Sequence, residues 1–164
     1  MPIQSSDIRF RLSGGASQAI QANSLGGVRS SVAATGSIFD TVSGTEATAG
    51  DIEYRCIYVM NTHATLTLAN LVFWISANTP LAGTDVAAGL GTSAVSGTEQ
   101  SVANENTAPV GVAFSAAGSK GIGIALGNLA PGASRAVWVR RTINAGTPAA
   151  ASDTFTLRAE GETA

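Results

Sequence analysis

The chain has 164 residues, enough for one domain with one sizeable core. Charged residues make up only 12% of the chain, about half the usual share in globular proteins, and Gly, Ala, Ser and Thr together make up half of it. Nine Lys and Arg against eleven Asp and Glu give a net charge of −2, which excludes a strongly basic surface suited to nucleic acid or to an anionic membrane.

The first predicted element is a strand over residues 8–12. Ile8, Phe10 and Leu12 alternate with two arginines, and this period of two is typical of a half-buried strand. Residues 13–50 are instead rich in Ser, Ala, Gly and Thr, and their apolar residues follow no such period. Unstructured segments of this length are uncommon inside compact domains. We therefore expect either short strands that the pattern does not reveal or an arm.

Strong strand patterns begin at residue 51. Residues 53–60 place Cys56 between Tyr54 and Tyr58 on one face of a predicted strand. Two short strands broken at residues 69–70 are predicted within 64–77, further strands over 121–126, 135–143 and 153–160, and weaker candidates over 84–95 and 111–115. The last strand is expected to point Phe155, Leu157 and Ala159 inward and Thr154, Thr156 and Arg158 outward.

Short strands about ten residues apart, separated by turns with Gly and Pro, are typical of a β-sandwich. We predict an all-β fold: an immunoglobulin-like or jelly-roll-like β-sandwich preceded by an extended N-terminal strand or arm. Residues 1–50 are assigned to the N-terminal strand and arm, and residues 51–164 to the sandwich. No apolar run approaches the roughly 18 residues of a membrane span, and the N-terminus lacks a charged segment followed by an apolar one, so we expect a soluble, non-secretory protein.

Enzymatic chemistry finds little support in the sequence. The one cysteine, Cys56, excludes an internal disulfide, and its position between two tyrosines is typical of a buried, inert thiol. The one histidine, His63, lies in a predicted turn and excludes a metal site built from histidines. Residues 89–94, GLGTSA, match a relaxed dinucleotide-binding pattern but lack the helix that must follow it. We predict a non-enzymatic protein with no cofactor and no metal.

Two further groups of side chains have alternative explanations. Arg140 and Arg141, with Arg135 and Arg158 on predicted C-terminal strands, form a cationic cluster. The cluster either makes an inter-subunit salt bridge or lies at a solvated strand end. Trp74 and Trp138 lie within predicted strands among apolar neighbours. That setting favours core packing over an exposed aromatic platform for sugars.

Several segments carry a resemblance to a known family. They are MPIQSSDIRFRLSGG at 1–15, LGG at 25–27, EYRCIYVMNTH at 53–63, ISANTP at 75–80, GTEQSVANENTAP at 97–109 and AVWVRRT at 136–142. In these segments, which span nearly the whole chain, the protein resembles a family of small virion structural proteins of tailed bacteriophages. The resemblance implies a part of the virion without specifying which part, and it brings no catalytic residues with it.

The resemblance and the composition together suggest a function in assembly. We expect a capsid decoration protein that binds the major capsid protein and copies of itself, with no nucleic acid and no membrane as partner. A tail, baseplate or tail-tip subunit is the first alternative, and a carbohydrate-binding surface-attachment module the second. The implied location is the virion, after synthesis in the cytoplasm of the bacterial host. The predicted assembly contacts are Ile8, Phe10, Leu12, Arg140 and Arg141.

Overall fold

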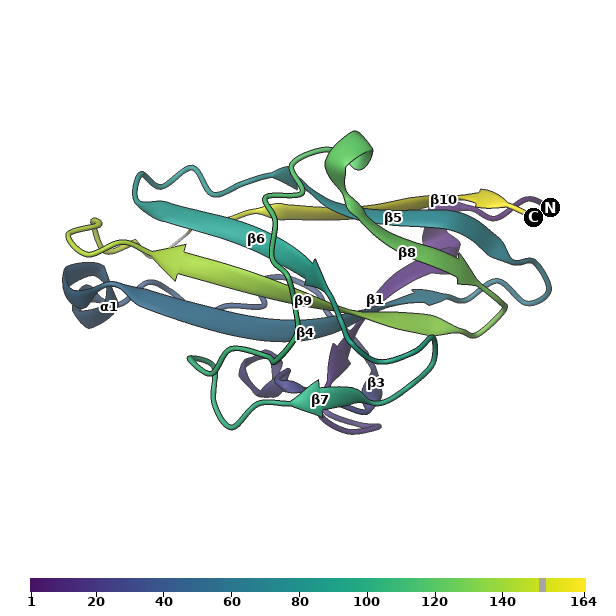
Figure 1. The fold of residues 1–164 in the computed structure, drawn as a ribbon, viewed down its shortest axis with the longest axis horizontal. Helices are drawn as coiled ribbons and strands as arrows, with labels where there is room; N and C mark the ends of the chain where they lie inside the picture. The colour runs from purple at the N-terminus through teal and green to yellow at the C-terminus, as the bar shows by residue number, and fades with distance from the viewer. Residues whose placement is uncertain (151–152) are drawn as a thin grey trace.

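Two antiparallel β-sheets packed face to face form the body of the protein, as the computed structural model of residues 1–150 and 153–164 shows (Figure 1). The strands are β1 (Ile8–Ser13), β2 (Gly26–Gly27), β3 (Arg29–Ala33), β4 (Asp51–Asn61), β5 (Leu68–Ala77), β6 (Thr84–Leu90), β7 (Glu99–Ser101), β8 (Ile124–Leu129), β9 (Ser134–Ile143) and β10 (Thr156–Thr163). One sheet has the order β3-β1-β4-β9-β6, the second β10-β5-β8, and β2 pairs with β7 in a small ribbon. The predicted all-β sandwich is confirmed.

Helical structure in residues 1–150 and 153–164 is confined to short segments. The helix α1 spans Gly44–Ala49, and single 3-10 turns occur at Ser5–Asp7, Gln21–Asn23 and Lys120–Ile122. Ser43 caps α1, since its hydroxyl accepts a hydrogen bond from the Glu46 backbone while the Glu46 carboxylate accepts one from Ser43 N–H. None of the described helices is both long and apolar enough to cross a bilayer.

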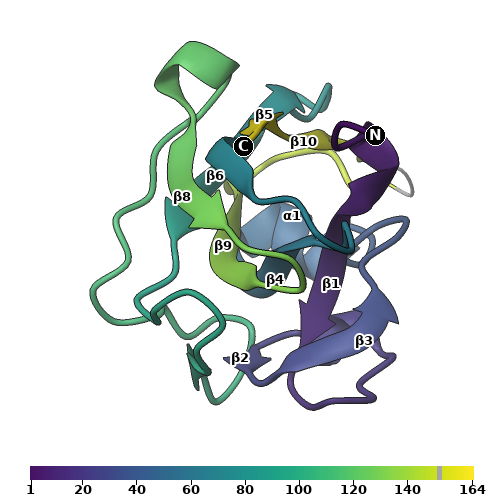
Figure 2. The same ribbon diagram turned by 90° about the vertical axis from the view of Figure 1, so that its right-hand side faces the viewer.

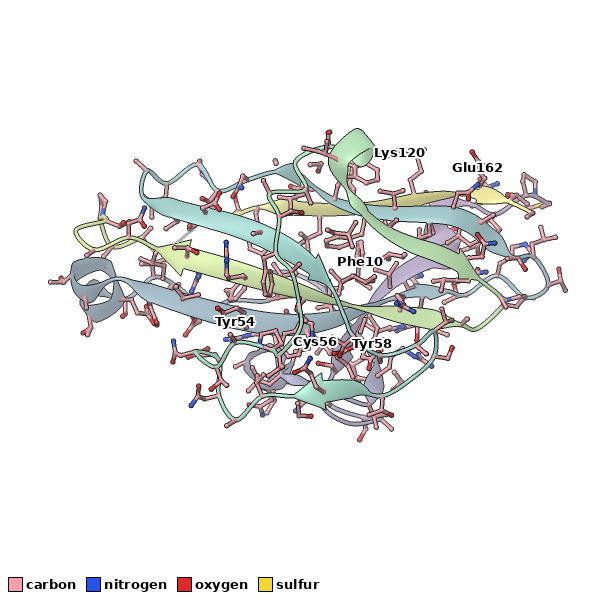
Figure 3. The ribbon with its side chains drawn as sticks, viewed as in Figure 1. Phe10, Tyr54, Cys56, Tyr58, Lys120 and Glu162 are labelled. Atoms are coloured by element: carbon pink, nitrogen blue, oxygen red, sulfur yellow. The ribbon has the colours of Figure 1, made fainter. Side chains whose placement is uncertain are left out.

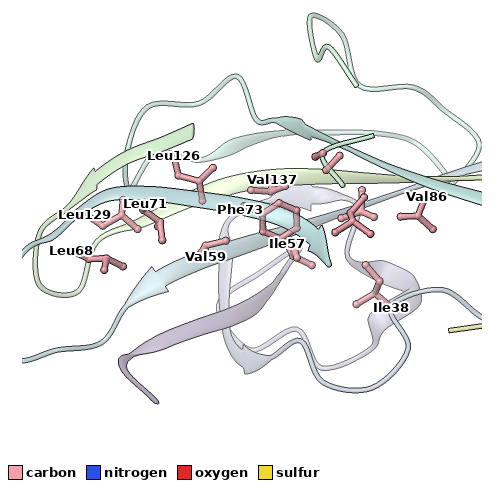
Figure 4. Close-up of a cluster of buried hydrophobic side chains, with 14 of the residues drawn as sticks. Ile38, Ile57, Val59, Leu68, Leu71, Phe73, Val86, Leu126, Leu129 and Val137 are labelled. Carbon is pink, nitrogen blue, oxygen red and sulfur yellow. The ribbon is translucent and has the colours of Figure 1, made fainter. Parts of the chain in front are cut away.

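The main core lies between the five-stranded and the three-stranded sheet (Figure 4). Alternation along each strand supplies it, because every second side chain points to the same face. Strands β4, β5, β8 and β9 contribute most of its members: Ile57, Val59, Leu68, Leu71, Phe73, Ile75, Leu126, Leu129, Val137 and Val139. The long strands β4 and β9, which are rich in β-branched and aromatic residues, pair over ten consecutive positions. They form the centre of the larger sheet.

A second core covers the opposite face of the larger sheet. Tyr54, Cys56, Tyr58, Ala136 and Trp138 are buried there. The segment between β6 and β8 crosses beneath this face and contributes Val102, Val112 and Phe114. Figure 1 shows β7 within this layer, below β4. The larger sheet is therefore covered on both faces, which explains why β4 is buried almost throughout.

The N-terminal strand belongs to the sandwich and does not extend away from it as an arm. β1 pairs with β4 through four consecutive positions, and Leu12 is fully buried. Further along, Ile38 and Phe39 belong to the main core. Residues 1–50 and the described part of residues 51–164 thus share one sheet and one core; residues 151–152 lie outside the described residues.

Several strand boundaries differ from the sequence-based expectation. The two strands predicted within 64–77 are one strand, β5, whose ladder shifts register where Asn70 adopts a positive φ of 50°. The candidate at 111–115 forms only an isolated bridge between Ser115 and Ala88. The sequence does not predict the short strands β2, β3 and β7, because the segments GG, RSSVA and EQS are too short and too poor in large apolar residues to show an alternating pattern.

Candidate functional site

The apolar side chains predicted as assembly contacts lie in the protein's own core. Leu12 is 0% exposed, so it has no surface with which to contact another molecule. Ile8 and Phe10 are half-buried and pack against the main core, and the Phe10 ring meets Phe73 edge to face at 6.0 Å. The alternating apolar pattern of these three residues marks β1 as a strand of the sandwich itself. Of the three, Ile8 and Phe10 keep part of their surface exposed for a contact.

The two arginines predicted as assembly contacts also have partners within the chain. Arg140 is half-buried, with its guanidinium 5.2 Å from the centre of the Phe114 ring. Arg141 is buried, and its Nε donates to Glu53 at 2.5 Å. Arg141 is therefore neither an inter-subunit contact nor a solvated strand end, because the pairing of β4 with β9 places the Glu53 carboxylate opposite it.

Arg141 belongs to a cluster of charged side chains at the end of the main core nearest α1. Glu53 and Arg55 of β4 and Arg141 of β9 lie on the core face and are buried, and Asp40 and Glu105 approach them from two loops. Arg55 bonds Glu105 at 2.5 Å, and Arg141 bonds the backbone carbonyl of Asp40 at 2.7 Å.

The Phe39 ring packs against both buried guanidiniums of this cluster. It is 5.3 Å from Arg55 and 4.9 Å from Arg141. Burial raises the pKa of Glu53, while the hydrogen bond from Arg141 acts in the opposite direction. The cluster thus binds the 36–43 loop to the sheet through charge, hydrogen bonds and a shared aromatic ring.

Three carboxylates of the cluster are close enough together to resemble a metal site. Oxygens of Asp40, Glu53 and Glu105 lie within 4.8 Å of one another. Each of these residues, however, already bonds Arg55 or Arg141. A cation would have to displace buried guanidiniums, so the arrangement fits a structural ion-pair network.

The cysteine and histidine have structural surroundings. Cys56 is fully buried between Tyr54 and Tyr58, as predicted (Figure 3). Burial raises the pKa of its thiol further above the neutral range, so the nucleophilic thiolate is disfavoured. His63 Nδ1 accepts hydrogen bonds from the backbone N–H groups of Thr65 and Leu66 and thereby shapes the turn before β5.

The glycine-rich segment at residues 89–94 begins in the last two residues of β6, and its glycines allow close packing. The next helical element in the described chain is the single 3-10 turn at Lys120–Ile122, so the helix that a dinucleotide-binding loop requires directly after it is not present among the described residues. A Cβ on Gly89 would lie 2.5 Å from Val112, and one on Gly91 would lie 2.7 Å from Ala136, so glycine permits the close approach of neighbouring chain. Glu99 closes this loop: burial alone would raise its pKa, but hydrogen bonds from Ser93 and Thr92 prevail and lower it to about 2.

The surface feature best suited to binding lies on the side of the sandwich where β1 and β10 face each other. A cavity of about 420 Å³ opens there, lined mainly by apolar side chains including Phe10, Ile38, Ile57, Phe155 and Leu157. A second hollow of about 280 Å³ borders the far half of β10. We call this side, which comprises residues 8–10, 34–38 and 153–161, the open side; in Figure 2, β6 and β8 lie together on the opposite side.

The sequence predicts the first and the last strand separately, but it does not predict the cavity between them. Their juxtaposition depends on the packing of the two sheets, for which the sequence carries no local signal.

Comparisons with protein families, with curated proteins and with solved structures found no match for this chain.

Proposed function

We propose that this protein is a non-enzymatic structural component of a tailed-bacteriophage virion, and specifically a capsid decoration protein that binds the major capsid protein and copies of itself. The observation that carries the proposal is the open side, where an apolar cavity lies beside the unpaired edge of β10. The apolar cavity can accept side chains of the major capsid protein, and the free strand edge beside it can pair with a strand of another copy through main-chain hydrogen bonds. The resemblance to phage virion proteins supplies the biological setting.

The charges and potential nucleophiles support binding over catalysis. Cys56 is buried, and His63 uses Nδ1 within a turn. The buried carboxylate of Glu53 is bonded to Arg141, and that of Glu99 to the loop that it closes. These groups stabilise the fold, and the larger sheet, covered on both faces, gives a rigid body for repeated contacts in a symmetric shell.

The distribution of aromatic side chains argues against the carbohydrate-binding alternative. A sugar platform needs exposed rings, but both Trp and both Tyr are buried and the five Phe are buried or half-buried, all within the described part of the chain. A tail, baseplate or tail-tip subunit would use the same open side on a different neighbour, so experiment has to separate it from a head protein.

Co-sedimentation with isolated virion parts tests the proposal. Labelled protein is mixed separately with phage heads stripped of accessory proteins and with phage tails, and we expect it to sediment with heads. Thr154→Arg places a cation at the cavity mouth and should abolish binding, whereas Thr98→Arg, an equally exposed change outside the open side, should leave binding intact. Binding to tails alone would support the tail alternative, and binding to neither would overturn the virion proposal.

A further inference from the structure

The outer edge of β10 carries unpaired backbone groups. β10 is the edge strand of the three-stranded sheet, and among the described strands it pairs with β5 alone. Between Glu160 and Glu162 the register shift places the additional residue on β5, because two steps on β10 match three steps on β5. β10 itself therefore keeps a regular alternation from Leu157 to Thr163.

That alternation determines which backbone groups point outward. Ala164 N–H donates to Thr67 O at 3.0 Å, toward the β5 side. Counting back in steps of two, even-numbered residues face β5, and the N–H and C=O groups of Leu157, Ala159 and Gly161 face away from it. Within the described part of the chain, none of these three outward residues has a backbone hydrogen-bond partner at that edge. The N-terminal segment lies beside the far half of the edge, where Ile3 N–H donates to Thr163 Oγ1 at 3.0 Å and residues 3–5 line the second hollow together with residues 158–161.

The side chains beside these groups carry opposite charges on one face. Arg158, Glu160 and Glu162 occupy every second position of β10, so they lie on one face of the strand, and all three are exposed. Lys120 pairs with Glu160 at 2.5 Å, and Figure 3 shows Lys120 and Glu162 on the outer side of the three-stranded sheet. Arg158 has no ion-pair partner among the residues that the structure describes.

We propose that β10 pairs antiparallel with β10 of a second copy of this chain, about a twofold axis at Ala159. In that register Ala159 faces its own copy and Leu157 faces Gly161, so the outward groups exchange hydrogen bonds across the axis. Arg158 then lies directly opposite Glu160 of the second copy, and the symmetry forms this pair twice.

Neighbouring registers lack this match. Centring the axis on Arg158 or on Glu160 places that residue opposite its own copy, and centring it on Gly161 places Glu160 opposite Glu162. Like charges directly opposite each other are unfavourable. The charge order of β10 therefore selects one self-complementary register, although charged edge strands otherwise discourage pairing.

This pairing extends the proposed function, because it identifies the strand through which copies of the protein bind each other. It rests on the proposed function only in assuming that the protein self-associates. It joins the two three-stranded sheets into one continuous sheet, with the hollows beside β10 flanking the contact.

The test is sedimentation-velocity analysis of the full chain across the micromolar range. We expect the wild type to dimerise. Arg158→Glu alone and Glu160→Arg alone each place like charges opposite each other at two sites, and should raise the dimer dissociation constant at least about tenfold. A mixture of the two variants should form a heterodimer, because each then supplies the charge that the other needs. Asp85→Arg, an exposed charge reversal on β6 on the opposite side of the sandwich, is the matched control and should dimerise like the wild type.

A wild type that stays monomeric overturns the pairing, and so does a dimer that both single reversals leave intact. Failure of the mixed variants to associate overturns the Ala159 register. Binding to phage heads is assayed on the same proteins. Loss of dimerisation with head binding retained would leave the proposed function standing, and the converse would leave the pairing standing.

Discussion

Glu53 and Arg141 lie directly opposite each other on β4 and β9, and their side chains bond at 2.5 Å in the core. Both side chains are nearly inaccessible to solvent, at 0% and 2% exposure. Charges removed from water in this way are costly unless they are paired. The pair therefore helps to fix the register of β4 against β9, since a slip of one strand by one residue would place the two charges on opposite faces of the sheet.

Removal of one partner should be far more harmful than removal of both. Arg141→Met leaves the Glu53 carboxylate buried without its cation, and we expect a loss of about 3–5 kcal/mol in the free energy of unfolding. The double change Glu53→Leu with Arg141→Met should recover much of this loss. Urea denaturation gives both values, with the exposed Arg9→Met as control. A double variant no more stable than Arg141→Met would contradict the account.

Glu99 should make stability sensitive to acid. Its pKa is about 2 in the folded protein against an ordinary value of 4.5, so the folded state binds fewer protons between these values. The stabilisation is complete above pH 4.5 and is lost as pH falls toward 2, by roughly 3 kcal/mol. When the free energy of unfolding is measured by denaturation at several pH values in this range, its decrease with falling pH should be smaller for Glu99→Gln than for the wild type by that amount. Glu162→Gln, at an exposed position, should follow the wild type, and equal slopes for all three proteins would refute the role of Glu99.

Trp138 should be a major contributor to the second core. It is 0% exposed and packs with Cys56 and Tyr58 on the face covered by the 91–115 segment. Trp138→Ala should lower the free energy of unfolding by about 3–5 kcal/mol, as is usual for a truncated buried aromatic side chain. Trp138→Phe, which keeps a ring, should lose less. Thermal melting measures both, and an unchanged melting temperature for Trp138→Ala would contradict the placement.

Deletion of residues 1–15 should abolish folding. The deletion removes β1 from between β3 and β4 and empties the core site of Leu12. We expect no cooperative thermal transition in the deleted chain, whereas removal of Met1 and Pro2, both exposed, should leave the transition in place. A shortened protein that melts cooperatively near the wild-type temperature would show that the N-terminal strand is dispensable.

The parts of the fold that sequence predicts are those with a local period. The alternation around Ile8–Leu12, Cys56, Trp138 and Leu157 matches the faces that these residues adopt in β1, β4, β9 and β10. β2, β3 and β7 have no such period, and their pairing depends on distant partners. The N-terminal strand was therefore expected to begin an arm, because the apolar residues that complete its core, such as Ile38, follow no pattern.

The buried charges were beyond sequence reasoning for a related reason. Glu53 and Arg141 are 88 residues apart, and only the register of β4 with β9 brings them together. A signal was nevertheless present. Arg141 shares a strand face with Val137 and Val139, and Arg55 shares one with Ile57 and Val59. A charge in phase with a core face predicts a buried partner and argues against a solvated strand end.

The central claim is that the open side is the binding surface, and hydrogen–deuterium exchange of the free and the head-bound protein tests it most directly. Amides of residues 34–38 and 153–157, which line the cavity, should exchange more slowly in the bound protein. Those of residues 92–98, in the layer over the second core, should exchange at the same rate in both. Slower exchange confined to residues 92–98, with the cavity lining unchanged, would contradict the account.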